Sequence, residues 1–367
     1  MKRIIHFSLA NSKGGITQYV LNNWKYIDKT RFQFDMVTFG GQLDFEGDLQ
    51  KEGCRIFYVK NRAEDDLEQF QKEILEVLSR GYDTVHLHTS YWKSFELEKL
   101  AKQVGIPQII VHAHNTGVFD DSEREEKQQQ HYRLLENLTP DIATDFCACS
   151  NAAANWLYED KIPKEKIQIL NNAIDVESFM FSNQKRKEYR ERIGWGNKFI
   201  IGHVGRFSYQ KNHEFLIEVF KKVVEKNKDA RLLLIGKGPL ENKVYSLVKR
   251  YGLIDKVHFT GICDDVNGWL QAMDMFALPS RFEGLPIVAV EAQSSGLQCL
   301  LSDKITRETK ITDRVSFLPL DITLWCNRIL LLKAGEEDRV NCTEQIRQVG
   351  YDIKTYIKIL EELYEKD

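Results

Sequence analysis

The alternation of short β-rich runs with amphipathic helical stretches constrains the fold of this chain more than any other feature. In the first half, helical stretches such as Thr17–Tyr26 and Leu67–Leu78 separate the apolar and β-branched runs. Short strands that alternate with helices are typical of parallel, doubly wound sheets. We expect strands at Ile4–Leu9, Phe34–Phe39, Arg55–Val59, Thr84–Leu87, Gln108–His112 and Phe146–Cys149.

A second alternating series begins near Lys198, with a strand at Phe199–Val204 and apolar residues at helical spacing from Phe215 to Val224. Further expected elements are strand Arg231–Ile235, helix Glu241–Arg250, strand Val257–Thr260, helix Val266–Met273, strand Met275–Leu278, helix Pro286–Ser295, strand Cys299–Leu301 and a final helix Ile353–Tyr364. The charged segment Gln184–Trp195, which is poor in apolar residues, is the expected junction. At 367 residues the chain exceeds the usual single core, so we expect two α/β halves of comparable size.

Composition excludes several classes of protein. The chain is 43% hydrophobic and 29% charged, and no apolar run approaches the ~20 residues that span a bilayer. A net charge of -3 does not favour a nucleic-acid partner, and the basic run from Lys185 to Arg192 is a local patch or a solvated helix face. The seven cysteines form no Cys-x-x-Cys pair and the N-terminus lacks a signal peptide, so we expect a cytoplasmic protein without disulfides or a metal site.

The first of three glycine-bearing junctions follows the opening strand and contains Gly14 and Gly15. Adjacent glycines let the backbone approach a ligand, and the next helix presents unpaired N–H groups to an anion. The run is neither Gly-x-Gly-x-x-Gly nor a P-loop. A plain tight turn explains it equally well.

The second junction, Gly205–Asn212, places Arg206 and Lys211 after the first strand of the second half. Ligands of open α/β sheets bind at this carboxyl edge. Two cations there suit a diphosphate whose charge grows as it leaves. The alternative is two solvated surface charges.

The third junction, Ser280–Ala292, is the most specific. Glu283 lies in a loop, Pro286 stands at the first helical turn, and Glu291 follows Glu283 by eight residues, inside the helix. Gly284 allows close approach, and the amides near Leu285 can face an anion. A carboxylate among apolar residues needs a partner, because leaving it unpaired costs several kcal/mol. A sugar diol or a structural ion pair would supply that partner for Glu291.

Together these motifs resemble the retaining glycosyltransferases of the GT-B family called glycosyltransferase group 1, or family 4. The resemblance spans the chain, and within it residues 110–115 and 301–306 resemble bacterial enzymes that make capsular polysaccharide or exopolysaccharide. Its core consists of Gly205-Arg206 with Lys211, Gly236-Lys237-Gly238-Pro239, Phe259-Thr260-Gly261 with Asp265-Val266, and the Glu-x7-Glu motif at Glu283 and Glu291.

The resemblance implies two Rossmann-like domains facing a central cleft. Residues 1–180, joined by a C-terminal helix 352–367 that crosses back, would bind the acceptor, and residues 196–350 would bind the nucleotide-sugar donor. Arg206 and Lys211 would hold the diphosphate, Glu291 the ribose, and Glu283 a hydroxyl of the donor sugar. The base would lie near Ile262. The backbone would also contact the donor at Gly14, Gly15, Gly236, Gly284 and Leu285.

The resemblance also places His114 next to the reacting sugar, with His112 as the competing choice. Ala173 stands where the family often has glycine, and the stretch after Asp303 lacks the family's glycine-rich return. No Asp-x-Asp motif is present, so cations in place of a metal would neutralise the leaving group. Retention of configuration, through a front-face substitution, follows from the resemblance alone.

The expected substrates are a nucleotide sugar, most consistent with a UDP-sugar, and a saccharide or lipid-linked saccharide; no cofactor is expected. Peripheral contact with the inner face of the cell membrane would accompany a lipid-linked acceptor. The acceptor wall would comprise the loops 8–13, 89–93 and 115–122, in which Tyr91, Trp92 and Phe119 could stack on sugar or isoprenoid or could equally be ordinary surface aromatics. The alternatives are a glycosyl phosphorylase or sugar-phosphate synthase, a non-catalytic nucleotide-sugar-binding protein, and an NAD(P)-dependent oxidoreductase, which the missing glycine fingerprint disfavours.

Overall fold

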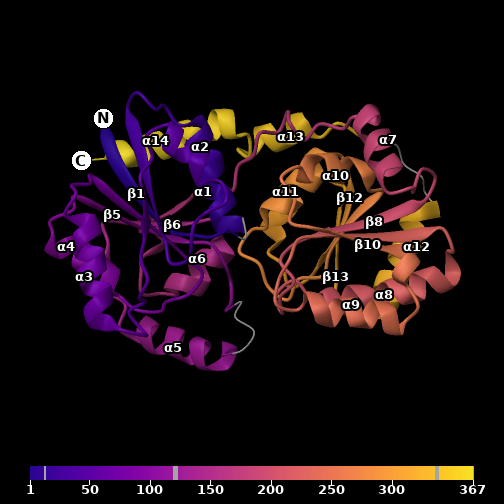
Figure 1. The fold of residues 1–367 in the computed structure, drawn as a ribbon, viewed down its shortest axis with the longest axis horizontal. Coiled ribbons are helices and arrows are strands. Elements are labelled where there is room, and N and C mark those ends of the chain that lie inside the picture. The colour runs from indigo at the N-terminus through magenta and orange to yellow at the C-terminus, as the bar shows by residue number, and fades with distance from the viewer. Residues whose placement is uncertain (12–13, 119–122, 335–338, 367) are drawn as a thin grey trace. The chain divides into compact units, whose positions relative to one another are not determined.

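The computed structural model describes residues 1–11, 14–118, 123–334 and 339–366 (Figure 1). Two compact units make up the described chain. The first contains residues 1–11, 14–118, 123–173 and 353–366, and the second contains residues 174–334 and 339–352.

The first unit is built on a seven-stranded sheet in the order β3-β2-β1-β4-β5-β6-β7, and every neighbouring pair is parallel. The six strands expected in this half are confirmed, whereas β7, a three-residue edge strand, was not predicted. The strands are β1 (Lys2–Leu9), β2 (Phe32–Thr38), β3 (Ile56–Tyr58), β4 (Thr84–Thr89), β5 (Gln108–Ala113), β6 (Asp145–Ala148) and β7 (Ile167–Ile169).

Helices cover this sheet, with α1 and α14 on one face and α3 and α4 on the other (Figure 1). The α-helices of the unit are α1 (Gly15–Tyr26), α2 (Glu46–Lys51), α3 (Leu67–Leu78), α4 (Glu96–Gln103), α5 (Arg124–Glu136), α6 (Asn151–Tyr158) and α14 (Ile353–Glu365). Two 3-10 turns, Pro140–Ile142 and Lys164–Lys166, connect them.

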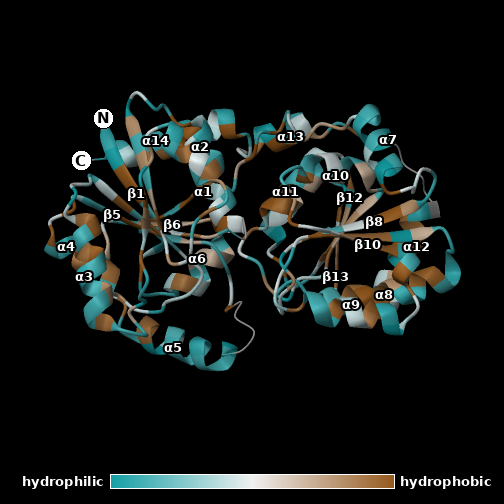
Figure 2. Ribbon diagram, in the orientation of Figure 1, coloured by the Kyte–Doolittle hydropathy of each residue, from teal (hydrophilic) through white to brown (hydrophobic). Residues whose placement is uncertain are grey.

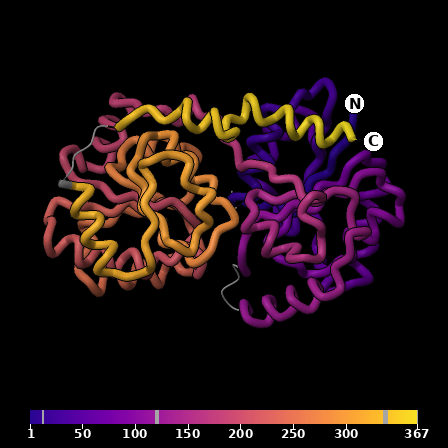
Figure 3. Tube along the Cα trace, turned by 180° about the vertical axis from the view of Figure 1, so that it is seen from behind, coloured from indigo at the N-terminus to yellow at the C-terminus, as the bar shows by residue number. Residues whose placement is uncertain are grey.

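The C-terminal helix α14 belongs to the first unit, as the resemblance implied. Its apolar side packs on α1, where the hydroxyl oxygens of Tyr356 and Tyr19 lie 2.9 Å apart. Near its end, the Leu363 carbonyl accepts a 2.8 Å hydrogen bond from the Gln108 side chain of β5. The N- and C-terminal ends of the described chain therefore lie together (Figure 3).

The second unit has a six-stranded parallel sheet in the order β10-β9-β8-β11-β12-β13. The five expected strands are confirmed, and β13 was not predicted. The strands are β8 (Phe199–Val204), β9 (Ala230–Ile235), β10 (Val257–Gly261), β11 (Met275–Leu278), β12 (Gln298–Ser302) and β13 (Val315–Leu318). Hydrophobic residues dominate these strands (Figure 2).

Each face of the second sheet has its own core. Helices α8, α9 and α12 cover one face through residues such as Phe220, Val248 and Trp325, and α10 and α11 cover the other through Leu270 and Ala289. The α-helices are α7 (Asn183–Arg192), α8 (His213–Lys226), α9 (Glu241–Arg250), α10 (Val266–Ala272), α11 (Ile287–Ser294), α12 (Ile322–Ala334) and α13 (Thr343–Gln348), with 3-10 turns at Ile254–Lys256 and Arg307–Thr309.

The charged segment that we expected as the junction is helix α7 of the second unit. Ser182 caps its N-terminus, and Arg186 and Arg190 both form ion pairs with Asp274. Arg190 Nη2 lies 2.6 Å from Asp274 Oδ2. Arg190 is 6% exposed, so part of the basic run is internal to the fold. The division between the units instead falls after residue 173, because the charges of α7 are satisfied by its own unit. In the described ranges, no helix combines the length and hydropathy needed to cross a membrane.

Candidate functional site

The loops at the carboxyl edge of the second sheet are held together by backbone hydrogen bonds. Gly205 N donates to the Ile235 carbonyl (2.9 Å), and Gly236 N donates to the Gly261 carbonyl (2.9 Å). Phe207 N and the Lys237 carbonyl form a third bond of 3.1 Å. The turns after β8, β9 and β10 therefore form one rigid rim, as a preorganised binding site requires.

Two glycines of this rim are required by steric contact. Gly236 has φ +128°, and a Cβ there would lie 2.3 Å from the Gly205 carbonyl oxygen. A Cβ on Gly238 would lie 2.4 Å from the Phe207 carbonyl oxygen. Backbone packs against backbone at both positions, so neither contact can be relieved by moving a side chain.

Lys211 and Glu283 form the central ion pair of the rim. Lys211 Nζ lies 2.6 Å from Glu283 Oε1, and their side chains are 15% and 8% exposed. Gln210 Nε2 donates to Glu283 Oε2 and to the Phe282 carbonyl, both at 3.0 Å. Arg281 N also donates to the Gln210 carbonyl (2.8 Å). The loop after β8 is thereby tied to the loop after β11, and the Glu283 carboxylate is fixed through both oxygens.

The stem of Lys211 is confined by the residue that begins the same loop. A Cβ on Gly205 would lie 3.0 Å from Lys211 Cδ and 3.2 Å from His203 Nε2. Asn212, which precedes α8, adopts the left-handed conformation at φ 55°, and its side chain donates to the Pro279 carbonyl. The ammonium group of Lys211 has three N–H donors, so it can contact an anion while it keeps Glu283.

Arg206 stands apart from this network. Its side chain is exposed, and it has no hydrogen bond or ion pair with another described residue. The structure therefore brings together Lys211, Gln210 and Glu283, and leaves Arg206 as a solvated cation in the same loop.

Glu291 is a buried carboxylate on α11. It is 8% exposed and has no side-chain hydrogen bond or ion pair within the described ranges. Burial raises the pKa of its carboxyl to about 7. The structural ion pair that was the alternative for this residue does not form. Pro286 precedes the helix as its cap residue, so the first turn begins one residue later than expected.

The other donor-side residues lie around this rim. Gly284 and Leu285 are buried in the turn before α11. Ile262 follows β10 and is 49% exposed, an apolar surface that a planar base could cover.

In the first unit, Gly14 caps α1 in an extended conformation and Gly15 begins the helix. A Cβ on Gly15 would meet nothing within 4 Å, so packing does not require glycine there. Ser12 and Lys13 of the same loop lie outside the described residues. Among described neighbours, the loop is held by Thr17, whose side chain accepts from Ala10 N at 3.0 Å.

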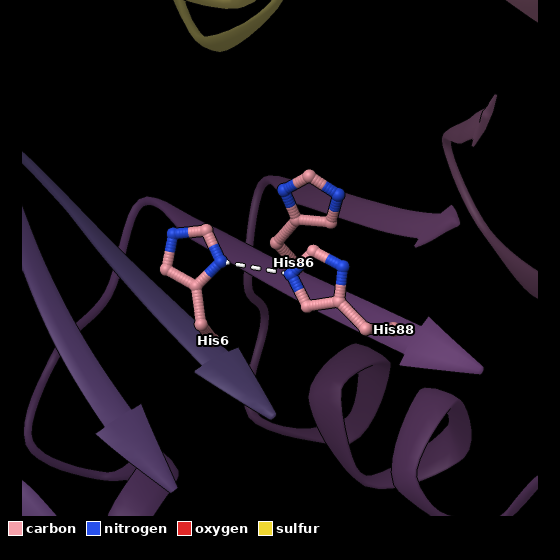
Figure 4. Close-up of side chains that lie close together, drawn as sticks. All are labelled: His6, His86 and His88. Atoms are coloured by element: carbon pink, nitrogen blue, oxygen red, sulfur yellow. Dashed lines mark hydrogen bonds between the residues drawn. The ribbon is translucent and has the colours of Figure 1, made fainter. Parts of the chain in front are cut away.

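His114 follows β5 and is partly exposed, whereas His112 is fully buried. His114 Nε2 lies 2.9 Å from His88 Nδ1, and His88 Nε2 lies 3.0 Å from His6 Nδ1. Figure 4 shows His6 on β1 and His86 and His88 on β4 with their rings close together. The sequence interpretation missed His6, His86 and His88. The alternation of histidine with apolar residues on the expected strands could have predicted that these side chains share one face of the sheet.

The prediction that Tyr91 and Trp92 stack on an acceptor is wrong. Each is 2% exposed, and Trp92 Nε1 donates to the Leu157 carbonyl at 2.7 Å. Both aromatic rings are core residues of the first unit. Phe119, the third aromatic residue of that prediction, lies outside the described residues.

Comparison with known families gives two matches that follow one another along the chain. Residues 14–173 match the family described as "Glycosyl transferase 4-like domain", and residues 185–349 match "Glycosyl transferases group 1".

Curated relatives align over the whole chain. A "Putative glycosyltransferase EpsF" of Bacillus subtilis is 30% identical over 380 residues, which cover 100% of this chain and 98% of the relative. A "UDP-Gal:alpha-D-GlcNAc-diphosphoundecaprenol alpha-1,3-galactosyltransferase" of Escherichia coli is 24% identical over 382 residues, 99% of this chain and 96% of the relative.

Among solved structures, HepE of Anabaena in complex with UDP and glucose superposes with a TM-score of 0.81 at 18% identity, covering 100% of both chains. WaaG, described as a glycosyltransferase involved in lipopolysaccharide biosynthesis, gives a TM-score of 0.74 at 15% identity over 100% of both chains. These likenesses support the same fold over the full length.

Proposed function

Because the chain belongs to the group 1 glycosyltransferases, family 4 of the GT-B fold, we propose that it moves a hexosyl or N-acetylhexosaminyl group from a UDP-sugar to an acceptor hydroxyl. The acceptor is a saccharide or a lipid-linked saccharide, and the anomeric configuration is retained. The product belongs to a bacterial polysaccharide. Relatives named for capsular polysaccharide biosynthesis and for galactosyl transfer from UDP-Gal support this assignment.

One observation carries the proposal: the fixed Lys211–Glu283 pair lies at the carboxyl edge of a parallel sheet, where such sheets bind ligands. Lys211 donates to the donor diphosphate and so stabilises the charge that grows on the leaving group. Glu283, which Gln210 orients, accepts a hydrogen bond from a hydroxyl of the donor sugar.

Glu291 binds the ribose in this scheme. Its carboxyl group is buried without a described partner, and a ribose diol offers two O–H donors to one carboxylate. Binding such donors stabilises the ionised form, so the nucleotide lowers the raised pKa of Glu291 toward its ordinary value. Ile262 contributes an exposed apolar surface for the base.

The remaining parts of the proposal concern the reaction itself. Arg206 is the second cation for the diphosphate, because its charge is not committed to another described residue, and no metal is needed for the leaving group. His114 faces the reacting sugar in preference to His112, which is fully buried. An oxygen of the leaving phosphate helps to deprotonate the acceptor on the same face of the sugar. Peripheral membrane contact accompanies a lipid-linked acceptor.

The test is a screen of UDP-, GDP-, ADP- and TDP-sugars for thermal stabilisation and slow hydrolysis, with the anomer identified in a single turnover. We expect UDP-sugars to stabilise the wild type and Lys211→Ala and Glu291→Ala to lose most of that effect. Lys226→Ala, an exposed lysine of α8, is the matched control and should bind as the wild type does. An inverted anomer would refute retention, and the absence of stabilisation by every nucleotide sugar would refute the donor site.

The alternatives give different results in the same screen. Release of sugar phosphate that depends on phosphate identifies a phosphorylase, and transfer to a sugar phosphate identifies a synthase; a curated relative is named "Mannosylfructose-phosphate synthase". Nucleotide-sugar binding without hydrolysis or transfer identifies a non-catalytic protein. The family excludes the oxidoreductase alternative.

A further inference from the structure

The first unit gathers five of the chain's nine histidines into one layer. The register pairs His6 of β1 with His86 of β4, and His88 of β4 with His112 of β5. Side chains two residues apart on a strand share a face, so His114 joins the same layer just past the end of β5. We call His6, His86, His88, His112 and His114 the histidine layer.

Ring nitrogens within this layer approach one another closely. Ligand atoms of His88, His112 and His114 all lie within 4.8 Å of one another. His88 Nδ1 and His114 Nε2 are 2.9 Å apart. Two imidazole nitrogens that share a tetrahedral ion at about 2.0–2.1 Å are about 3.3 Å apart, so small ring rotations suffice to form such a site.

His112 contributes a ring nitrogen without a described partner. His112 Nε2 is fully buried and has no hydrogen-bond partner among the described residues. A buried polar atom without a partner costs free energy that a ligand can recover. Burial also lowers the pKa of His88, His112 and His114, so all three rings are neutral at pH 7 and can offer a lone pair to a metal.

The outer nitrogens of His88 and His112 already have partners. His112 Nδ1 lies 3.2 Å from His86 Nε2, and His86 Nδ1 lies 2.8 Å from the Tyr364 hydroxyl. His88 Nε2 lies 3.0 Å from His6 Nδ1. Metal-binding histidines typically donate their other ring N–H to such a partner, which fixes the orientation of the ring.

We propose that His88 Nδ1, His112 Nε2 and His114 Nε2 bind a divalent transition-metal ion, for which Zn²⁺ is the best match. Three neutral imidazoles suit Zn²⁺ better than Mg²⁺ or Ca²⁺, which prefer oxygen. Another possible group, His6 with His86 and His88, is buried throughout, whereas His114 is partly exposed and gives the ion a way in. The site goes beyond the proposed function and does not involve the donor diphosphate.

Binding of the ion leaves the number of protons on the histidines unchanged. In the tautomer in which His114 Nε2 donates to His88 Nδ1, that hydrogen moves to His114 Nδ1, so that both facing nitrogens have lone pairs. His88 then donates from Nε2 to His6, and His112 donates from Nδ1 to His86. One ring changes tautomer, no net proton is released, and the ion adds two positive charges.

The experiment uses the untagged full-length chain after treatment with a chelator. Co²⁺ is titrated and followed by its visible absorption, and Zn²⁺ is then measured by competition with a chromophoric chelator. We expect one equivalent of Co²⁺ with the absorption of a tetrahedral site, which Zn²⁺ displaces. His86→Gln, which removes an orienting partner, should weaken binding about 10–100-fold.

The ligand variants make the site assignment falsifiable. His112→Gln and the more exposed His114→Gln should each weaken binding more than His86→Gln does, with circular dichroism confirming the fold. His258→Gln, on β10 of the second unit, is the control and should leave binding unchanged. Absence of stoichiometric binding by the wild type would overturn the proposal, and so would wild-type affinity in a folded His114→Gln variant. Because binding is measured without substrate, neither result depends on the proposed transfer reaction.

Discussion

The carboxyl edges of the two sheets have the same parallel topology but opposite chemistry. In the second unit, Lys211 is paired with Glu283, and Arg206 is exposed in the same loop. In the first unit, the histidine layer reaches this edge at His88, His112 and His114, and burial keeps these three rings neutral. A doubly wound sheet therefore presents residues at a fixed place, while the residue types there set their charge and solvation.

The largest effect is expected from a substitution at the carboxyl edge of the second sheet. If Lys211 donates to the leaving diphosphate as proposed, Lys211→Ala should lower turnover about 10²–10³-fold. Steady-state rates with the donor found in the screen would measure this loss, with Lys226→Ala as the control. A rate within a few-fold of the wild type would mean that Lys211 serves only to hold Glu283.

A comparable effect on stability is expected from Gly236→Ala. The new Cβ would meet the Gly205 carbonyl oxygen at 2.3 Å, and φ +128° is unfavourable for alanine. We expect a loss of about 3 kcal/mol in the free energy of unfolding. Urea unfolding at equilibrium measures it, and a loss below about 1 kcal/mol would show that the rim can relax.

Acid should weaken the first unit. Burial lowers the pKa of His6 to about 3, so in the folded state the ring stays neutral where the unfolded chain takes up a proton. The contribution of His6 is fully present above about pH 6.5 and is lost as pH falls toward 3. At pH 5 the free energy of unfolding should be about 2 kcal/mol lower than at neutral pH because of His6.

Urea unfolding of the wild type and His6→Leu at pH 7 and pH 5 tests this prediction. The variant should lose less stability between the two pH values than the wild type, while His258→Gln, whose ring is only partly buried, should change this loss less than His6→Leu does. Equal losses in His6→Leu and the wild type would show that the buried ring does not set the acid sensitivity.

The smallest effect is expected at Gly15. Its Cβ position is open, so Gly15→Ala should stabilise the chain by about 0.4–1 kcal/mol by restricting the unfolded state. Thermal unfolding would detect the gain. If the variant is stable but no longer binds the donor, Gly15 is needed for the close approach of a ligand. Gly236, in contrast, is needed because its backbone packs against Gly205.

The sequence was sufficient to predict most strands, because each central strand is a continuous apolar run bounded by turn residues. β7 and β13 are short edge strands whose signal is weak, and they were missed. The charges of α7 looked like those of a linker, since its pairing with Asp274 joins residues about eighty positions apart.

The candidate site was predicted in the same uneven way. Lys211, Glu283 and Glu291 were predicted from their spacing in the sequence. The ion pair of Lys211 and the burial of Glu291 without a described partner could not be predicted, because both depend on how three loops fold together. The histidine layer depends on the register of β1, β4 and β5, which no local pattern specifies. Tyr91 and Trp92 were misread because a loop position does not reveal burial.

The placement of α14 has a consequence for synthesis. Its Tyr356 and Tyr364 complete the polar layer above β1 and β4, yet they are translated after the entire second unit. A chain emerging from the ribosome therefore lacks the Tyr364 partner of His86 until α14 has been made. The domain made second can reach its native state before the one made first.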